Sequence, residues 1–187
     1  HGEPLIERTI KQLHEAGIYE IYIVVGFMKE QYEYLIDQYD VRLIVNAEYS
    51  VKNNLHSVKL AGKYLENAYI VPCDIWCRRN PFRKHELYSW YMVSDQLKPN
   101  SSVRVNRKME LVSVPDSEDG NEAIGICYLT GKDGPAVAKR IEKLAEDPRY
   151  DNVFWEEALY GKDRMTVPAR VVPAGDAVEI NTYEQLR

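Results

Sequence analysis

Short apolar runs alternate with segments of helical spacing along the first part of the chain. Ile21 to Val25, Leu43 to Val45 and Tyr69 to Val71 are continuous runs rich in β-branched residues. The segments before each run carry apolar side chains three and four positions apart, which is typical of an amphipathic helix. The resulting order of helix and strand predicts a parallel sheet with right-handed crossovers. We therefore expect an α/β protein with a doubly wound, mostly parallel sheet.

The middle of the chain predicts antiparallel structure. Val103 to Val105 and Leu111 to Val114 flank a polar segment, as the two strands of a hairpin do. The pattern further predicts a strand, two helical stretches and a last strand, at Ala123 to Leu129, Val137 to Leu144, Phe154 to Leu159 and Arg170 to Val172. No linker of flexible composition separates these parts. We expect a small antiparallel lobe within one domain of residues 1–187.

Composition excludes several classes of partner. Lys and Arg number 24 against 29 for Asp and Glu, a net charge of -5, so nucleic acid is not expected as a partner. No run approaches the ~18 apolar residues of a membrane span. The three cysteines lack a metal-ligand spacing, which predicts no zinc site and favours a reducing cytoplasm. The fingerprint motifs of dehydrogenases, P-loop NTPases, serine hydrolases and zinc proteases are absent from the sequence.

Asp74 is the acid that follows the third apolar run. Ligands of open α/β sheets bind beyond the carboxyl ends of the strands, so Asp74 is expected at that rim. A carboxylate there suits a divalent cation that carries nucleotide phosphates, because such cations take hard oxygen ligands. The alternative is that Asp74 caps the following turn.

Several short motifs follow one another along the chain, at residues 4–7, 26–31, 46, 53–57, 69–74, 153–156 and 178–181. Taken in this order, they resemble the motifs of the bacterial CTP:phosphocholine cytidylyltransferases of the nucleotidyltransferase superfamily. The resemblance implies a Rossmann-like nucleotidyltransferase fold. It implies transfer of a nucleoside monophosphate, CMP from CTP, onto a phosphorylated aminoalcohol such as phosphocholine, with release of pyrophosphate. A kinase that phosphorylates the acceptor, fused or separate, is an implied partner.

The resemblance also implies roles for individual residues. Asp74 matches the catalytic, metal-binding acid, and Asn181 stands where the family has a second acid, so both are expected to hold Mg²⁺. Asn53, Asn54 and Ser57 match the helix start that approaches the nucleotide. For the two asparagines, the alternative is that either one simply caps the helix.

The implied acceptor site is aromatic and acidic. Trp155 and Glu156 are its main candidates, and Trp76 and Tyr91 are expected to complete it, because a quaternary ammonium is held by aromatic faces and a carboxylate. The alternative for Trp155 is a place in the core of an ordinary amphipathic helix. Ser102 stands where the family has a further aromatic residue, which leaves a primary ammonium open as the acceptor group.

The family's first strand and its Gly-rich loop, with an Arg and a Pro-Lys pair, have no counterpart in this sequence. A final helix expected after Thr182 is also cut at Arg187. The domain is therefore expected to be incomplete at both ends, and the chain as it stands to be inactive. Two alternatives stay open, a sugar-1-phosphate nucleotidyltransferase and a catalytically silent nucleotide-binding regulatory domain.

Overall fold

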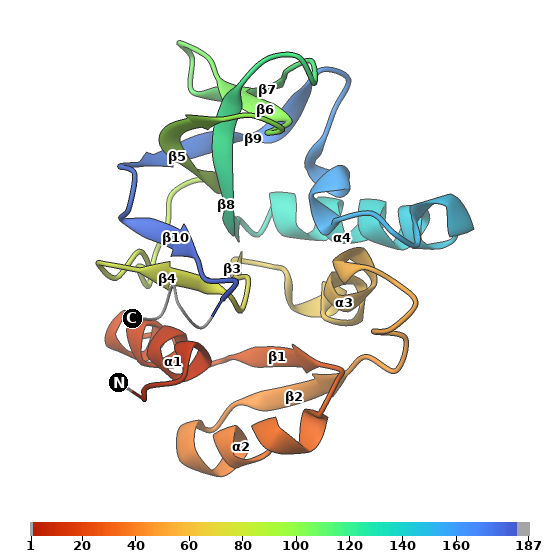
Figure 1. The fold of residues 1–187 in the computed structure, drawn as a ribbon. Helices are drawn as coiled ribbons and strands as arrows, with labels where there is room; N and C mark the ends of the chain where they lie inside the picture. The colour runs from red at the N-terminus through yellow and green to blue at the C-terminus, as the bar shows by residue number, and fades with distance from the viewer. Residues whose placement is uncertain (1, 183–187) are drawn as a thin grey trace. The chain divides into compact units, whose positions relative to one another are not determined.

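The computed structural model describes residues 2–182, and the helix expected after Thr182 lies outside them (Figure 1). The chain forms two compact units, each built from separate stretches of sequence. The first unit comprises residues 2–16, 69–128 and 160–182, and the second comprises residues 17–68 and 129–159. The expectation of one domain over residues 1–187 stays a prediction.

The first unit contains one helix and most of the strands. Its six-stranded sheet has, in spatial order, β3 (Ala68–Ile70), β8 (Gly120–Leu129), β5 (Trp90–Lys98), β9 (Arg164–Val172), β7 (Glu110–Ser113) and β6 (Val103–Val105). The remaining elements are α1 (Leu5–Glu15) and a two-stranded sheet of β4 (Ile75–Cys77) and β10 (Ala177–Glu179). This unit holds the antiparallel part of the fold.

Strand β5 lies at the centre of the larger sheet. It pairs antiparallel with β8 and parallel with β9, while β7 pairs antiparallel with both β9 and β6. The β6–β7 hairpin was predicted and is confirmed. The first five residues of β5, from Trp90 to Ser94, are all buried. A strand covered on both faces loses the alternation of apolar and polar residues, which explains why the sequence pattern did not predict β5.

Helix α1 is held in the first unit by its apolar stripe and by two polar side chains. Ile10 and Leu13 are buried on one face of the helix. Arg8 and Gln12 both donate hydrogen bonds to the carbonyl oxygen of Cys77, at 2.9 and 3.4 Å. These bonds fix α1 against the end of β4.

The second unit combines a short parallel sheet with helices. Its elements are β1 (Tyr22–Val25), η1 (Lys29–Tyr32), α2 (Tyr34–Tyr39), β2 (Arg42–Val45), α3 (Asn54–Leu60), η2 (Gly62–Tyr64), α4 (Asp133–Ala145), η3 (Pro148–Tyr150) and η4 (Trp155–Leu159). β1 and β2 pair in parallel, from Tyr22 opposite Arg42 to Val25 opposite Val45. The alternation expected for this stretch, and the parallel pairing it implied, are confirmed.

Helices α3 and α4 pack side by side in the second unit, although they lie far apart in the sequence (Figure 1). Leu55 of α3 and Ile141 of α4 are fully buried. Gly134, in the first turn of α4, lies so close to the chain that a Cβ there would collide with the carbonyl oxygen of Leu65. A glycine is therefore required where α4 begins.

The α/β class expected from the sequence is confirmed, as is the small antiparallel lobe. The stretch from Phe154 to Leu159 is helical as predicted, but as the 3₁₀ helix η4 rather than an α-helix. Between residues 2 and 182, no helix combines the length and the apolar character needed to cross a membrane.

Candidate active site

Asp74 and Asn181 lie on neighbouring chain segments of the first unit. Asp74 ends the turn before β4, and its side chain is half-buried. The backbone N–H of Ile180 donates to the carbonyl oxygen of Asp74 at 2.8 Å. This bond extends the β4–β10 pairing, in which Ile75 faces Glu179, by one residue beyond β10. The pairing brings the two predicted magnesium ligands to the same end of the two-stranded sheet.

Within residues 2–182, the carboxylate of Asp74 makes no side-chain hydrogen bond or ion pair. Burial raises the pKa of the neighbouring Cys73 thiol, and the charge of Asp74 raises it further. One carboxylate and one amide oxygen suit Mg²⁺, which keeps waters and takes substrate phosphates as ligands. No group of three or more His, Cys, Asp or Glu side chains in the described part of the chain is arranged to hold a metal ion.

The two aromatic candidates of the first unit have different surroundings. Trp76 is half-buried in β4, and the guanidinium carbon of Arg8 lies 5.3 Å from its ring centroid. This ring therefore already faces a cation of the protein itself. Tyr91 is 2% exposed in β5, where it pairs with Cys127 and Ala169 on the flanking strands. Its ring offers no face to solvent in this structure.

Asn53 and Asn54 occupy the start of α3 in the second unit, and both are engaged. Asn53 is the N-cap, because its side-chain oxygen accepts the backbone N–H of Asn54 at 2.7 Å. The capping interpretation is thus confirmed for Asn53. The Asn54 side-chain oxygen accepts the backbone N–H of Trp155 at 2.8 Å. Residues predicted separately, for the nucleotide and for the acceptor, are therefore in direct contact.

Ser57 is oriented by a buried asparagine. Asn46 is 4% exposed and donates from Nδ2 to the Ser57 hydroxyl oxygen at 3.0 Å. The other end of the Asn46 side chain accepts the backbone N–H of Glu48 at 2.9 Å. Because the Ser57 oxygen accepts this bond, its own O–H remains a donor. A hydroxyl fixed in this way suits an acceptor atom such as a base carbonyl.

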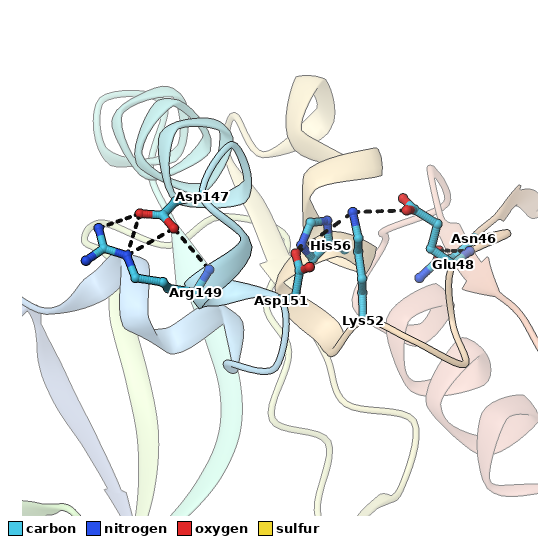
Figure 2. Close-up of polar contacts among 7 residues, drawn as sticks. All are labelled: Asn46, Glu48, Lys52, His56, Asp147, Arg149 and Asp151. Carbon is cyan, nitrogen blue, oxygen red and sulfur yellow. Dashed lines mark hydrogen bonds and ion pairs between the residues drawn. The ribbon is translucent and has the colours of Figure 1, made fainter.

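A charged network beside the start of α3 was not predicted from the sequence. Lys52 lies between Glu48 and Asp151 (Figure 2). Its Nζ is 3.0 Å from the Glu48 carboxylate and 3.9 Å from that of Asp151, and His56 Nε2 is 3.1 Å from the same Asp151 carboxylate. The hydrogen bond from Lys52 lowers the pKa of Glu48. His56 is 5% exposed. His56 and Asp151 are 95 positions apart, and no local sequence pattern connects them.

The 3₁₀ turn before Asp151 has its own ion pair. Asp147 accepts the backbone N–H of Arg149 and also pairs with its guanidinium (Figure 2). The side-chain hydrogen bond from Arg149 lowers the pKa of the Asp147 carboxyl. This pair shapes η3 locally.

Trp155 is 2% exposed, whereas its neighbour Phe154 is 62% exposed. Glu156, next along η4, is half-buried. The burial of Trp155 fits the core position that the sequence left open as an alternative. Its ring does not offer a free face for a cation in this structure.

Comparison with known proteins identifies related chains. Residues 1–84 match the MobA-like NTP transferase domain family. The choline-phosphate cytidylyltransferase of Streptococcus pneumoniae (strain ATCC BAA-255 / R6) is 31% identical over 161 residues, covering 84% of this chain and 70% of that protein. The 2-aminoethylphosphonate cytidylyltransferase of Lancefieldella rimae is 26% identical over 180 residues, covering 85% of this chain and 68% of that protein.

Solved structures agree with these relatives. The CTP:phosphocholine cytidylyltransferase from Streptococcus pneumoniae matches with a TM-score of 0.88 and 25% identity, over 100% of this chain and 84% of that chain. A glucose-1-phosphate thymidylyltransferase from Bacillus anthracis matches with a TM-score of 0.69 over 98% of this chain and 79% of that chain. Its identity is 14%, so this match supports the fold alone. The resemblance seen in the sequence motifs is confirmed, and the chain belongs to the choline-phosphate cytidylyltransferase family of nucleotidyltransferases.

Proposed function

We propose that this protein transfers CMP from CTP to phosphocholine and releases pyrophosphate. The observation that carries the proposal is the 31% identity to a choline-phosphate cytidylyltransferase across 84% of the chain. The position of Asp74 beside the Asn181 segment supports it, because a carboxylate and an amide oxygen are ligands that suit Mg²⁺ bound to nucleotide phosphates.

In the proposed reaction, a phosphate oxygen of the acceptor attacks the α-phosphorus of CTP in line with the leaving pyrophosphate. One P–O bond forms and one breaks, and catalysis consists mainly of positioning and charge stabilisation. Asp74 and Asn181 would hold Mg²⁺, which supplies neutralisation of the phosphate charge. The acceptor phosphate is already ionised, so the step needs no general base.

For the nucleotide, we propose Asn53, Asn54 and Ser57 as binding residues. Asn53 contributes by capping α3. The Asn54 side-chain NH₂ and the Ser57 O–H are the donors left after the contacts described above. Two donors of this kind suit the carbonyl and ring nitrogen on the edge of a cytosine base.

For the acceptor, we propose Glu156 as the carboxylate that faces the cationic head group. Trp76, Trp155 and Tyr91 remain proposals as aromatic contacts. Trp155 and Tyr91 are both 2% exposed, so either ring could contact an acceptor only after a local change in packing. Cation–aromatic contact contributes about 0.5–2 kcal/mol where it forms.

The test is a pyrophosphate-release assay of the full-length protein with CTP. The acceptors are phosphocholine, phosphoethanolamine, 2-aminoethylphosphonate and glucose 1-phosphate. We expect kcat/KM for phosphocholine to exceed that for glucose 1-phosphate by about tenfold or more, because a sugar leaves the cation-binding groups without a partner. Preference for the sugar phosphate would favour a sugar-1-phosphate nucleotidyltransferase, and CTP binding without turnover would favour a silent regulatory domain.

A second candidate acceptor is an aminoalkylphosphonate. The relative from Lancefieldella rimae is named as a 2-aminoethylphosphonate cytidylyltransferase, and it is 26% identical over 180 residues. Ser102 lies where the resemblance places an aromatic residue, and its hydroxyl is 3.5 Å from the hydroxyl of Tyr160. Hydroxyl and carboxylate acceptors suit a primary ammonium, whose N–H groups donate hydrogen bonds.

Asn181→Asp is expected to lower the Mg²⁺ concentration needed for half-maximal rate. The substitution adds a second charged oxygen next to Asp74, and carboxylates bind this hard cation more strongly than amides do. The measurement is initial rate against Mg²⁺ concentration in the full-length protein. Asn100→Asp, which adds the same charge at an exposed position of the same unit, is the control. An equal Mg²⁺ requirement in all three proteins would remove Asn181 from the proposed metal site.

We also propose a cytoplasmic reaction and a separate or fused kinase that supplies the phosphorylated acceptor. Cys73, Cys77 and Cys127 are free thiols, as in proteins of reducing compartments.

A further inference from the structure

We propose that Asn54 is a positioning residue that fixes the acceptor segment, defined here as residues 151–157, against the start of α3. His56 assists it through Asp151. The inference rests on the proposed function, because the acceptor role of Glu156 is part of that proposal. It assigns Asn54 a double role: its oxygen holds the acceptor segment, and its NH₂ faces the nucleotide.

Four contacts tie the acceptor segment to α3. The Asn53 backbone N–H donates to the Asp151 carbonyl at 2.7 Å, and Asn53 Nδ2 donates to the Asn152 carbonyl at 3.2 Å. His56 contacts the Asp151 carboxylate at 3.1 Å, and Asn54 accepts from the Trp155 N–H at 2.8 Å. Three of the four residues from 53 to 56, namely Asn53, Asn54 and His56, thus contact one distant segment.

The Asn54 side chain supplies a hydrogen-bond acceptor for the first backbone N–H of η4, that of Trp155. Trp155 is the first residue of this 3₁₀ helix, and the first N–H groups of any helix lack an intrahelical acceptor. The carbonyl three residues earlier belongs to Asn152, and it accepts from Asn53 Nδ2. The start of η4 is therefore capped by a side chain from α3. The orientation of Glu156, one residue further on, depends on that cap.

Polar contacts also hold Asp151, the first residue of the acceptor segment. Both His56 and Lys52 contact the Asp151 carboxylate, and Lys52 also forms an ion pair with Glu48 (Figure 2). The His56 side chain is 5% exposed, and the Asp151 side chain is 29% exposed. The Asp151 carboxylate therefore lies between the buried His56 ring and the Lys52 ammonium group.

The test compares Asn54→Ala with Asn54→Asp in the full-length protein. Aspartate keeps an oxygen that accepts the Trp155 N–H but loses the NH₂ donor, whereas alanine loses both. If the oxygen positions the acceptor segment, Asn54→Ala should raise KM for phosphocholine about 3- to 10-fold, the range expected for one lost hydrogen bond. Asn54→Asp should have the wild-type KM for phosphocholine, because it keeps the oxygen. Its KM for CTP should be raised, as in Asn54→Ala, because both variants lack the NH₂ donor.

Hydrogen exchange provides a readout that does not need turnover. Asn54→Ala should speed amide exchange of the peptide that contains residues 153–157, and Asn54→Asp should return it to the wild-type rate. His56→Ala should speed exchange near residue 151 without changing the KM for CTP. The matched control is Asn67→Gly: Asn67 Oδ1 likewise accepts a backbone N–H from a distant segment, that of Gly131, at 2.7 Å. Glycine also tolerates the positive φ of 50° at this position.

The outcomes separate the inference from the proposed function. Wild-type exchange at residues 153–157 in Asn54→Ala would overturn the positioning role. So would equal rises in KM for phosphocholine in Asn54→Ala and Asn54→Asp, since only one of them lacks the oxygen. If the exchange results hold but the wild type turns over none of the acceptors, the positioning contact stands and the proposed function fails.

Discussion

Asp74→Asn in the full-length protein is expected to reduce turnover by about 100-fold or more, because a charged metal ligand and the charge neutralisation it supports are lost together. The amide is nearly the same size as the carboxylate, and the Asp74 side chain makes no hydrogen bond to other residues of the described chain. The fold should therefore be unchanged. Pyrophosphate release at saturating CTP and phosphocholine measures the effect, and thermal unfolding verifies that stability is retained.

Asp116→Asn is the control for this substitution. Asp116 lies in an exposed loop of the same unit, so the variant makes the same change in charge away from β4 and β10. It should keep wild-type turnover. Near-normal activity in Asp74→Asn would remove Asp74 from the proposed metal site and return it to the role of a turn residue.

Trp155→Ala is expected to lower the free energy of unfolding by about 3–5 kcal/mol, the range for removing a large aromatic side chain from a core. The reason is the 2% exposure of Trp155, together with full burial of Leu159 in the same short helix. This is a large share of the roughly 5–15 kcal/mol that stabilises a typical domain. Denaturant unfolding, followed by circular dichroism, measures the loss.

Phe154→Ala is the matched comparison, since this neighbouring aromatic residue is 62% exposed. It should change stability by no more than about 0.5 kcal/mol, as most surface substitutions do. If Trp155→Ala instead keeps wild-type stability and weakens only the acceptor, the ring belongs to the acceptor pocket and not to the core.

The first strands could be predicted from the sequence because their signal is local. Tyr22–Val25 and Arg42–Val45 are short apolar runs between turns, and the structure has both as strands. Strands β4 and β10 could not be predicted in this way. Each has three residues, and each is a strand only because it pairs with the other from a distant part of the chain. Pairing of this kind leaves no periodic pattern in either segment.

In the candidate site, too, the sequence could predict individual residues but not the contacts between distant segments. The order of motifs predicted Asp74 and Asn181 as metal ligands, and the structure adds that their segments are hydrogen-bonded neighbours. The contact between Asn54 and Trp155 spans 101 positions, and the sequence could name both residues but not their bond. Asp151 was not predicted at all, because a single acid in a polar stretch resembles any surface residue. Its contacts with His56 and Lys52 arise only in the folded chain.

The division of the second unit between residues 17–68 and 129–159 has a consequence for synthesis on the ribosome. Helix α3 leaves the exit tunnel well before α4, so the face of α3 that packs against α4 in the finished protein is uncovered during that interval. Chains in this state expose apolar surface, and they aggregate more readily than finished domains. Slow translation of the intervening residues would lengthen the exposure, whereas a chaperone that binds the nascent chain would shield it. Codon usage between residues 69 and 128 therefore bears on the yield of folded protein.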